Sequence, residues 1–155
     1  MTALETGDKA PGFVLPRDGG ETISLEQHVG SKVVLFFYPK DDTSGCTAEA
    51  IAFSGLKQQF EDSGATIIGM SPDSAGKHDK FIKKHELTVA LASDEDKSTL
   101  DAYGVWVEKS MYGRKYMGVE RSTFLISEDG TILKIWRKVK VPGHAEEVLE
   151  AVRAA

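Results

Sequence analysis

The chain has 155 residues, of which 41% are apolar and 28% charged, and it carries a net charge of −5. This length and composition are typical of one globular domain, here residues 1–155, and they exclude a disordered or fibrous chain. The negative net charge disfavours binding to nucleic acid or to an anionic membrane surface.

The single cysteine and the absence of long apolar runs bear on the compartment in which the protein works. Cys46 is the only cysteine, so no disulfide can form within the chain. The longest apolar run, residues 33–38, is far shorter than the roughly 20 residues of a membrane-spanning helix. Residues 1–5 lack the basic region and apolar stretch of a signal peptide. We therefore expect a cytoplasmic protein that binds neither nucleic acid nor membrane.

The first third of the chain predicts a hairpin, a buried strand and a helix. Residues 13–15 (FVL) and 21–23 (ETI), with turn-forming glycines between them, predict an N-terminal hairpin. Residues 32–38 read KVVLFFY, a continuous apolar run typical of a strand covered on both faces. Pro39 ends this strand, and apolar residues at helical spacing predict one helix over residues 46–62.

The rest of the chain alternates predicted strands and helices. The expected elements are a strand at 66–70, a helix at 74–85, a short strand at 89–91, a short helix at 97–103, strands at 121–126 and 131–139, and a helix at 145–154. Glu128-Asp129-Gly130 between the last two strands is a hairpin signal. This order indicates an α/β fold of the thioredoxin-like type, with a mixed central sheet, flanking helices and an N-terminal hairpin extension.

Cys46 stands where a cysteine becomes reactive. It follows a buried strand and a short loop, in the first turn of the predicted helix. Helix N-termini present unpaired N–H groups and a partial positive charge, which stabilise the nucleophilic thiolate. Thr43, three residues earlier, either points its hydroxyl at the same pocket or caps the helix. The position therefore favours a reactive thiol over a small buried apolar side chain.

A family resemblance starts from the same residues. Pro39, Thr43 and Cys46 match the Pro-x-x-x-Thr/Ser-x-x-Cys motif of the peroxiredoxins. The stretch FYPKDDTSGCT closely resembles the bacterioferritin comigratory protein (peroxiredoxin Q) subfamily, as do residues 7–11, 93–96, 103–106 and 121–126. The resemblance covers nearly the whole chain. It implies a thiol-dependent peroxidase that reduces hydrogen peroxide and organic hydroperoxides without a metal or other cofactor.

The resemblance also implies catalytic roles for four residues. Cys46 would be the peroxidatic cysteine, which attacks the peroxide and becomes a sulfenic acid. Thr43 would hydrogen-bond the thiolate and the peroxide. Arg121 would stabilise the thiolate and the charge that develops on the leaving oxygen. Pro39 would shield the pocket from water.

Two departures from the family pattern concern the helix start and the regeneration of the enzyme. Many relatives carry a resolving cysteine five residues after the first, where this chain has Ile51, and Ser44 stands where proline is common. We expect Ile51 to be an apolar anchor that keeps the first helical turns folded. The sulfenic acid would then be reduced by an external thiol (a small thiol, a glutaredoxin or a thioredoxin), with small thiols preferred.

Alternative readings of the sequence are weaker. His78 and His85 would lie about 10 Å apart on one helix, too far for one metal, and we expect solvated histidines. A non-enzymatic redox sensor or holdase is the alternative function, but a sensor needs only an exposed thiol, so Thr43 and Arg121 favour catalysis. We expect a monomer, because relatives of this subfamily are often monomeric and no exposed apolar stripe is evident.

Overall fold

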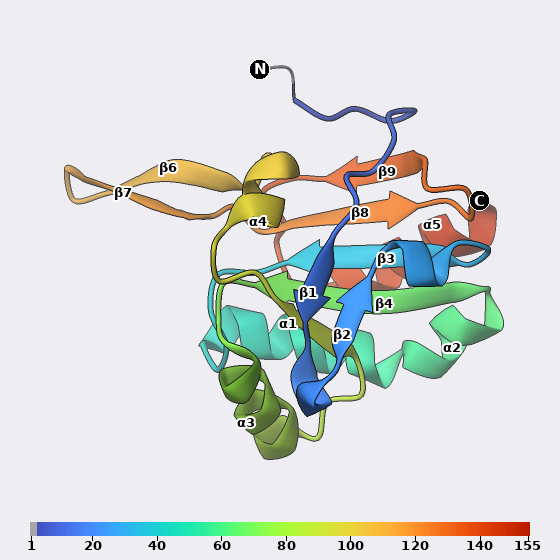
Figure 1. Ribbon diagram of the computed structural model, residues 1–155, viewed down its shortest axis with the longest axis horizontal. Helices are drawn as coiled ribbons and strands as arrows, with labels where there is room; N and C mark the ends of the chain where they lie inside the picture. The colour runs from blue at the N-terminus through green and yellow to red at the C-terminus, as the bar shows by residue number, and fades with distance from the viewer. Residues whose placement is uncertain (1–2) are drawn as a thin grey trace.

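A five-stranded mixed sheet lies at the centre of the computed structural model, which describes residues 3–155 (Figure 1). The strand order is β5 (Ala90–Ser93), β4 (Ala65–Ser71), β3 (Lys32–Phe37), β8 (Ser122–Ile126) and β9 (Ile132–Trp136). β4 is parallel to β3 and β5, whereas β8 is antiparallel to β3 and β9. Residues 1 and 2, which begin the segment searched for a signal peptide, lie outside the described residues.

Two hairpins and the helices surround this sheet. The hairpins are β1 (Val14–Pro16) with β2 (Thr22–Ser24), and β6 (Trp106–Met111) with β7 (Arg114–Val119). The helices are α1 (Ser44–Gly55), α2 (Lys57–Asp62), α3 (Ala75–His85), α4 (Ser98–Ala102) and α5 (His144–Ala154), and the 3-10 turns are η1 (Asp18–Gly20) and η2 (Glu26–His28). None of the helices between residues 3 and 155 has both the length and the apolar character needed to cross a membrane.

β3 forms the middle of the core because its side chains alternate between the two faces of the sheet. Val34 and Phe36 pack on one face with Phe53 of α1 and with residues of α2, α3 and α5. Leu35 and Phe37 pack on the other face, which the β1–β2 hairpin and α4 cover. Figure 1 shows β1 and β2 in front of the sheet, with α1 and α5 behind it. The predicted N-terminal hairpin, mixed sheet and flanking helices are confirmed.

The prediction of one helix over residues 46–62 is wrong in that the helix is broken. Leu56 has φ −104° and ψ 4°, so it ends α1 and precedes α2. Its N–H donates to the carbonyl oxygens of Phe53 and Ser54, which tightens the last turn of α1. Phe53, Leu56 and Phe60 all pack into the same core. Their spacing therefore continues across the break, which is why the sequence pattern predicted a single helix.

The β6–β7 hairpin was not predicted, although the sequence carried a signal for it. Tyr112 and Gly113 join the strands with φ 51° and 77°, the left-handed values of a tight two-residue hairpin turn. The hairpin projects away from the central sheet (Figure 1). Because it lies outside that sheet, its strands lack the apolar run of a buried strand.

Ile51 does not play the expected structural part. Its side chain is 47% exposed on α1, whereas Ala50 and Phe53 of the same helix are fully buried. A side chain in this position faces solvent and cannot fix the first turns of α1 against the core. The predicted apolar anchor at Ile51 is therefore wrong.

Candidate active site

Cys46 lies in the first turn of α1, just beyond the end of the central strand β3. The loop of residues 38–43 connects the two elements. Cys46 is a free cysteine that is only 1% exposed, and its Sγ accepts a hydrogen bond from Nη2 of Arg121 at 3.3 Å. A helix N-terminus and a guanidinium both stabilise a thiolate at this position.

Arg121 reaches Cys46 because of the pairing between β3 and β8. Phe37 at the end of β3 pairs with Ser122 at the start of β8, so Arg121 lies beside the loop that follows β3. Its Nη1 donates to Oε1 of Glu49 at 2.7 Å, while Nη2 donates to Cys46. Burial acts to lower the pKa of Arg121, but the negative charges of Glu49 and Cys46 raise it. The guanidinium is therefore held in its charged form between two acidic groups.

The close approach of Arg121 to α1 depends on a glycine. A Cβ atom at Gly45 would lie 3.2 Å from Nη2 of Arg121, tighter than an ordinary contact. A side chain at this position would press on the nitrogen that donates to Cys46. Gly45 thus leaves the room in which the guanidinium and the sulfur meet.

Sequence reasoning missed Glu49. It is 1% exposed, Oε1 accepts from Arg121, and Oε2 has no hydrogen-bond partner among the described residues. Burial raises the pKa of Glu49 to about 7, although Arg121 acts to lower it. The available signal was its spacing of three residues from Cys46, which places a carboxylate on the buried face of α1.

Glu49 should make the stability of the reduced protein depend on pH. The unfolded carboxyl ionises near its ordinary value of 4.5, whereas the folded one retains its proton up to about pH 7. Its contribution is therefore fully present below about pH 4.5 and is lost as the pH rises through 7. Relative to Glu49→Gln, the wild type should lose about 3 kcal/mol of unfolding free energy across this range. Urea titrations of both proteins at several pH values test this, and parallel pH profiles would contradict it.

Thr43 and Pro39 lie on the loop between β3 and α1. Thr43 is the residue before α1, but its hydroxyl makes no capping bond and instead donates to the carbonyl oxygen of Lys40 at 2.8 Å. The helix-cap alternative for Thr43 is therefore wrong. No hydrogen bond joins Thr43 to Cys46 within residues 3–155, and the hydroxyl oxygen retains lone pairs that can accept one. Pro39 is half-buried.

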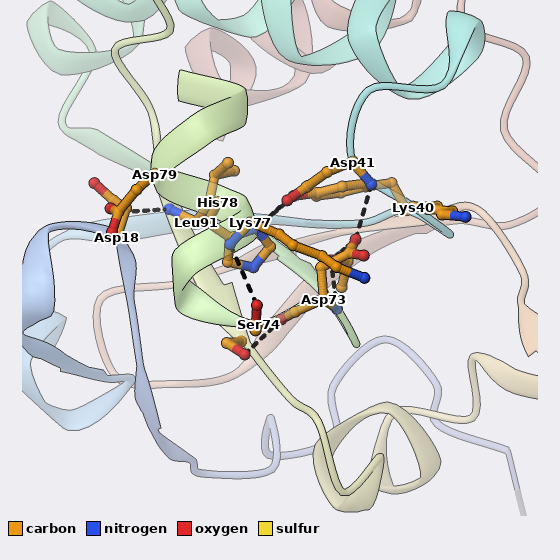
Figure 2. A network of polar contacts seen from close by, with 12 residues as sticks. Asp18, Lys40, Asp41, Asp73, Ser74, Lys77, His78, Asp79 and Leu91 are labelled. Atoms are coloured by element: carbon orange, nitrogen blue, oxygen red, sulfur yellow. Dashed lines mark hydrogen bonds and ion pairs between the residues drawn. The ribbon is translucent and has the colours of Figure 1, made fainter. Parts of the chain in front are cut away.

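The expected solvation of His78 is wrong. Its side chain is 0% exposed, Nδ1 lies 2.6 Å from Oδ2 of Asp41, and Nε2 lies 2.9 Å from the carbonyl oxygen of Ala92. Figure 2 shows His78 on α3, directed toward Asp41 of the loop. His85 contacts the exposed carboxylate of Asp42 instead. Residues 3–155 contain no group of three or more histidine, cysteine, aspartate or glutamate side chains that could hold a metal ion.

Comparison with known proteins shows which family the chain resembles. The AhpC/TSA family model matches residues 6–135. Peroxiredoxin Bcp of Bacillus subtilis is 47% identical over 150 residues, covering 97% of this chain and 96% of its own. Peroxiredoxin Q of Xanthomonas campestris has a TM-score of 0.88 and 45% identity, covering 92% of this chain and 90% of its own. A cysteine-to-serine mutant of PrxQ from Xylella fastidiosa has a TM-score of 0.94 and 40% identity, covering 99% and 98%.

The fold and these matches define a peroxiredoxin, and the chain belongs to the AhpC/TSA family. Within this family it is of the Bcp/PrxQ type and is a thiol peroxidase. The predicted thioredoxin-like fold and the prediction of an enzyme that reduces hydroperoxides are thereby confirmed.

Proposed function

We propose that Cys46 is the peroxidatic cysteine of this enzyme and that an external thiol completes its cycle. The observation that carries this proposal is the 3.3 Å hydrogen bond from Arg121 to the Cys46 Sγ in the first turn of α1. One guanidinium and one helix N-terminus act on the same buried sulfur. This is an environment in which a thiolate is both stabilised and kept apart from bulk water.

The reaction starts when the Cys46 thiolate attacks one oxygen of the hydroperoxide. A sulfur–oxygen bond forms, the oxygen–oxygen bond breaks, and the leaving oxygen takes up a proton to become water or an alcohol. Arg121 stabilises the negative charge that develops on this leaving oxygen. The hydroxyl hydrogen of Thr43 is donated to the carbonyl oxygen of Lys40, so the lone pairs of Thr43 Oγ1 can accept a hydrogen bond from the hydroperoxide. Pro39 limits the entry of water.

Both hydrogen peroxide and organic hydroperoxides are proposed as substrates. The bacterioferritin comigratory protein of Xanthomonas campestris has been solved as trapped-intermediate and ligand complexes that bear on its alkyl peroxide reduction activity. That protein is 44% identical to this chain and has a TM-score of 0.88. We extend the alkyl peroxide activity to this chain on that likeness.

Regeneration of Cys46 has to come from another molecule. The sequence holds one cysteine, so the sulfenic acid cannot form a disulfide within the chain. An external thiol attacks the sulfenic sulfur, which releases water and leaves a mixed disulfide, and a second thiol then frees Cys46. Because Cys46 is 1% exposed, a small thiol reaches it more easily than a glutaredoxin or thioredoxin does. A cycle that consumes thiols supports a reducing, cytoplasmic location.

Peroxide consumption with and without dithiothreitol tests the proposed cycle. With the thiol, the wild type should turn over many times, and without it the wild type should consume about one peroxide per chain. Cys46→Ser should consume no peroxide beyond the direct reaction of dithiothreitol with peroxide, measured without protein. Sustained consumption by Cys46→Ser above that background, or by the wild type without thiol, would overturn the proposal.

A monomer is the proposed assembly, on the resemblance to relatives of the subfamily. The expectation that no apolar stripe is exposed is wrong, because Met111, Tyr112, Tyr116 and Met117 are exposed on the β6–β7 hairpin. Light scattering of the reduced protein should give the 16.9 kDa of one chain. A stable mass of two or more chains would refute the monomer.

A further inference from the structure

A buried polar cluster joins the loop of residues 38–43, which connects β3 to α1, to helix α3 and to the ends of β4 and β5 (Figure 2). Asp41 of the loop is its centre. The N–H of Asp41 donates to Oδ2 of Asp73 at 2.8 Å, and its Oδ1 accepts from the Tyr38 hydroxyl at 2.6 Å. Its Oδ2 lies 2.6 Å from Nδ1 of His78, with both side chains buried. The peroxide chemistry described above uses none of these contacts.

The partners of His78 fix where its protons lie. The carbonyl oxygen of Ala92, 2.9 Å from Nε2, can only accept, so Nε2 carries a hydrogen. Two lone pairs facing each other at 2.6 Å would repel, so a second hydrogen lies between Nδ1 and Oδ2 of Asp41. The pair therefore holds one shared proton, as imidazolium with carboxylate or as imidazole with carboxylic acid. Without that proton, the contact between α3 and the loop would become repulsive.

The remaining polar groups around this pair keep it in place. Burial raises the pKa of Tyr38 well above its usual value, and the negative charge of Asp41 raises it further, so the hydroxyl remains a donor. It also lies 3.5 Å from Nδ1 of His78. Asp73 accepts from the Ser71 hydroxyl at 2.8 Å as well as from the Asp41 N–H. Each atom of Asp41 that faces this cluster thus has a partner.

The loop needs such an anchor because of its shape. Asp42 has φ 61°, a left-handed conformation that residues with a side chain rarely adopt. The carboxylate of Asp42 accepts from Lys84 at 2.7 Å and from His85 at 2.8 Å, but Asp42 and Lys84 are exposed, so these contacts contribute little. The buried bond between His78 and Asp41 is the stronger tie between α3 and the loop.

We infer that His78 is a positioning residue for the peroxide reaction, because the proton it shares with Asp41 fixes the loop that carries Pro39 and Thr43. The Thr43 hydroxyl bonds to Lys40, the residue directly before Asp41, so a shift of Asp41 moves the hydrogen-bonding group of Thr43. A displacement of about 1 Å at such a group can slow a reaction by as much as about 100-fold. The inference rests on the proposed role of Cys46.

Two substitutions of His78 separate positioning from general stability. The amide nitrogen of asparagine lies near the place of Nδ1, so His78→Asn retains a donor to Asp41 and loses the bond to Ala92. The amide of glutamine reaches the place of Nε2, so His78→Gln retains the bond to Ala92 and loses the bond to Asp41. Each variant loses the ring and one hydrogen bond, which makes them matched controls for stability.

The readout is the second-order rate constant for oxidation of Cys46 by hydrogen peroxide, with alkylation of Cys46 by iodoacetamide as a second measurement. His78→Gln should be oxidised at least about tenfold more slowly, whereas His78→Asn should stay within about threefold of the wild type. Alkylation should become faster in His78→Gln, because a loosened loop exposes the buried thiol. Opposite changes in the two rates would not arise from a less reactive sulfur.

Asp41→Asn is the conservative rescue. Its amide can donate to neutral His78 while its carbonyl oxygen accepts from Tyr38, so the network persists with a hydrogen that does not dissociate. It should retain the wild-type rate. Where His78→Gln does not fold, Tyr38→Phe removes one donor to the same carboxylate and should slow oxidation at least about threefold.

The outcomes distinguish this inference from the proposed function. Equal oxidation rates in His78→Gln and His78→Asn, or a wild-type oxidation rate in His78→Gln or Tyr38→Phe, would overturn the positioning role of His78. The proposed role of Cys46 would stand in that case, because Cys46 would still be oxidised by peroxide. A slow Asp41→Asn would also overturn the positioning role. If peroxide leaves wild-type Cys46 unmodified, the proposed function itself fails.

Discussion

Arg121→Ala is expected to slow the oxidation of Cys46 by peroxide by at least tenfold and up to about 100-fold, a loss of about 1.4–2.7 kcal/mol of transition-state stabilisation. The reason is geometric. Nη2 of Arg121 donates to the Cys46 Sγ at 3.3 Å, so in the proposed reaction the guanidinium is the charged donor nearest to the sulfur that attacks the peroxide. Rapid mixing of the reduced protein with hydrogen peroxide measures the rate constant.

A control is needed because Arg121→Ala also leaves Glu49 buried without its partner. Glu49→Gln combined with Arg121→Ala removes this unpaired buried carboxyl, so at pH values where the carboxyl would ionise the double variant should be more stable than Arg121→Ala while its peroxide rate stays low. Arg121→Lys retains the charge but cannot donate to Glu49 and Cys46 as a planar fork, so its rate should be intermediate. A wild-type rate in the double variant would reject the role of Arg121.

Thr43→Val is expected to slow the same reaction by at least about tenfold. Valine matches the shape of threonine but lacks the hydroxyl, so it removes both the bond to Lys40 and the acceptor offered to the hydroperoxide. Thr43 is exposed, so the loss of unfolding free energy should be small. Thr43→Ser, which retains the hydroxyl, should react at nearly the wild-type rate. Equal rates in the valine and serine variants would show that the hydroxyl plays no part.

The sequence predicted those parts of the molecule that depend on local pattern. The apolar run of β3 determined a strand buried on both faces, and the short spacing of Pro39, Thr43 and Cys46 marked the loop and the helix start. The position of Arg121 came from family resemblance, since 75 residues separate it from Cys46. Only the pairing of β8 with β3 brings the two together.

The features that the sequence did not predict depend on partners that are distant along the chain. Glu49 is buried beside Arg121, 72 residues later, whose guanidinium donates a hydrogen bond to its carboxyl group. His78 is buried because Asp41, 37 residues earlier, and the carbonyl oxygen of Ala92 satisfy both ring nitrogens. A charged or polar residue on a helix is normally solvated, and no local pattern reveals a partner on another element.

Mass spectrometry tests most directly the claim that Cys46 reacts with peroxide and is reduced by an external thiol. The protein is analysed after one equivalent of hydrogen peroxide, first without and then with a small thiol. Without thiol, the wild type should carry a sulfenic acid at Cys46 or a Cys46–Cys46 link between two chains. After a glutathione-type thiol is added, a mixed disulfide should form at Cys46 and then give way to the free thiol. Peroxide consumed while Cys46 remains unmodified, or an oxidised Cys46 that small thiols cannot reduce, would contradict the account.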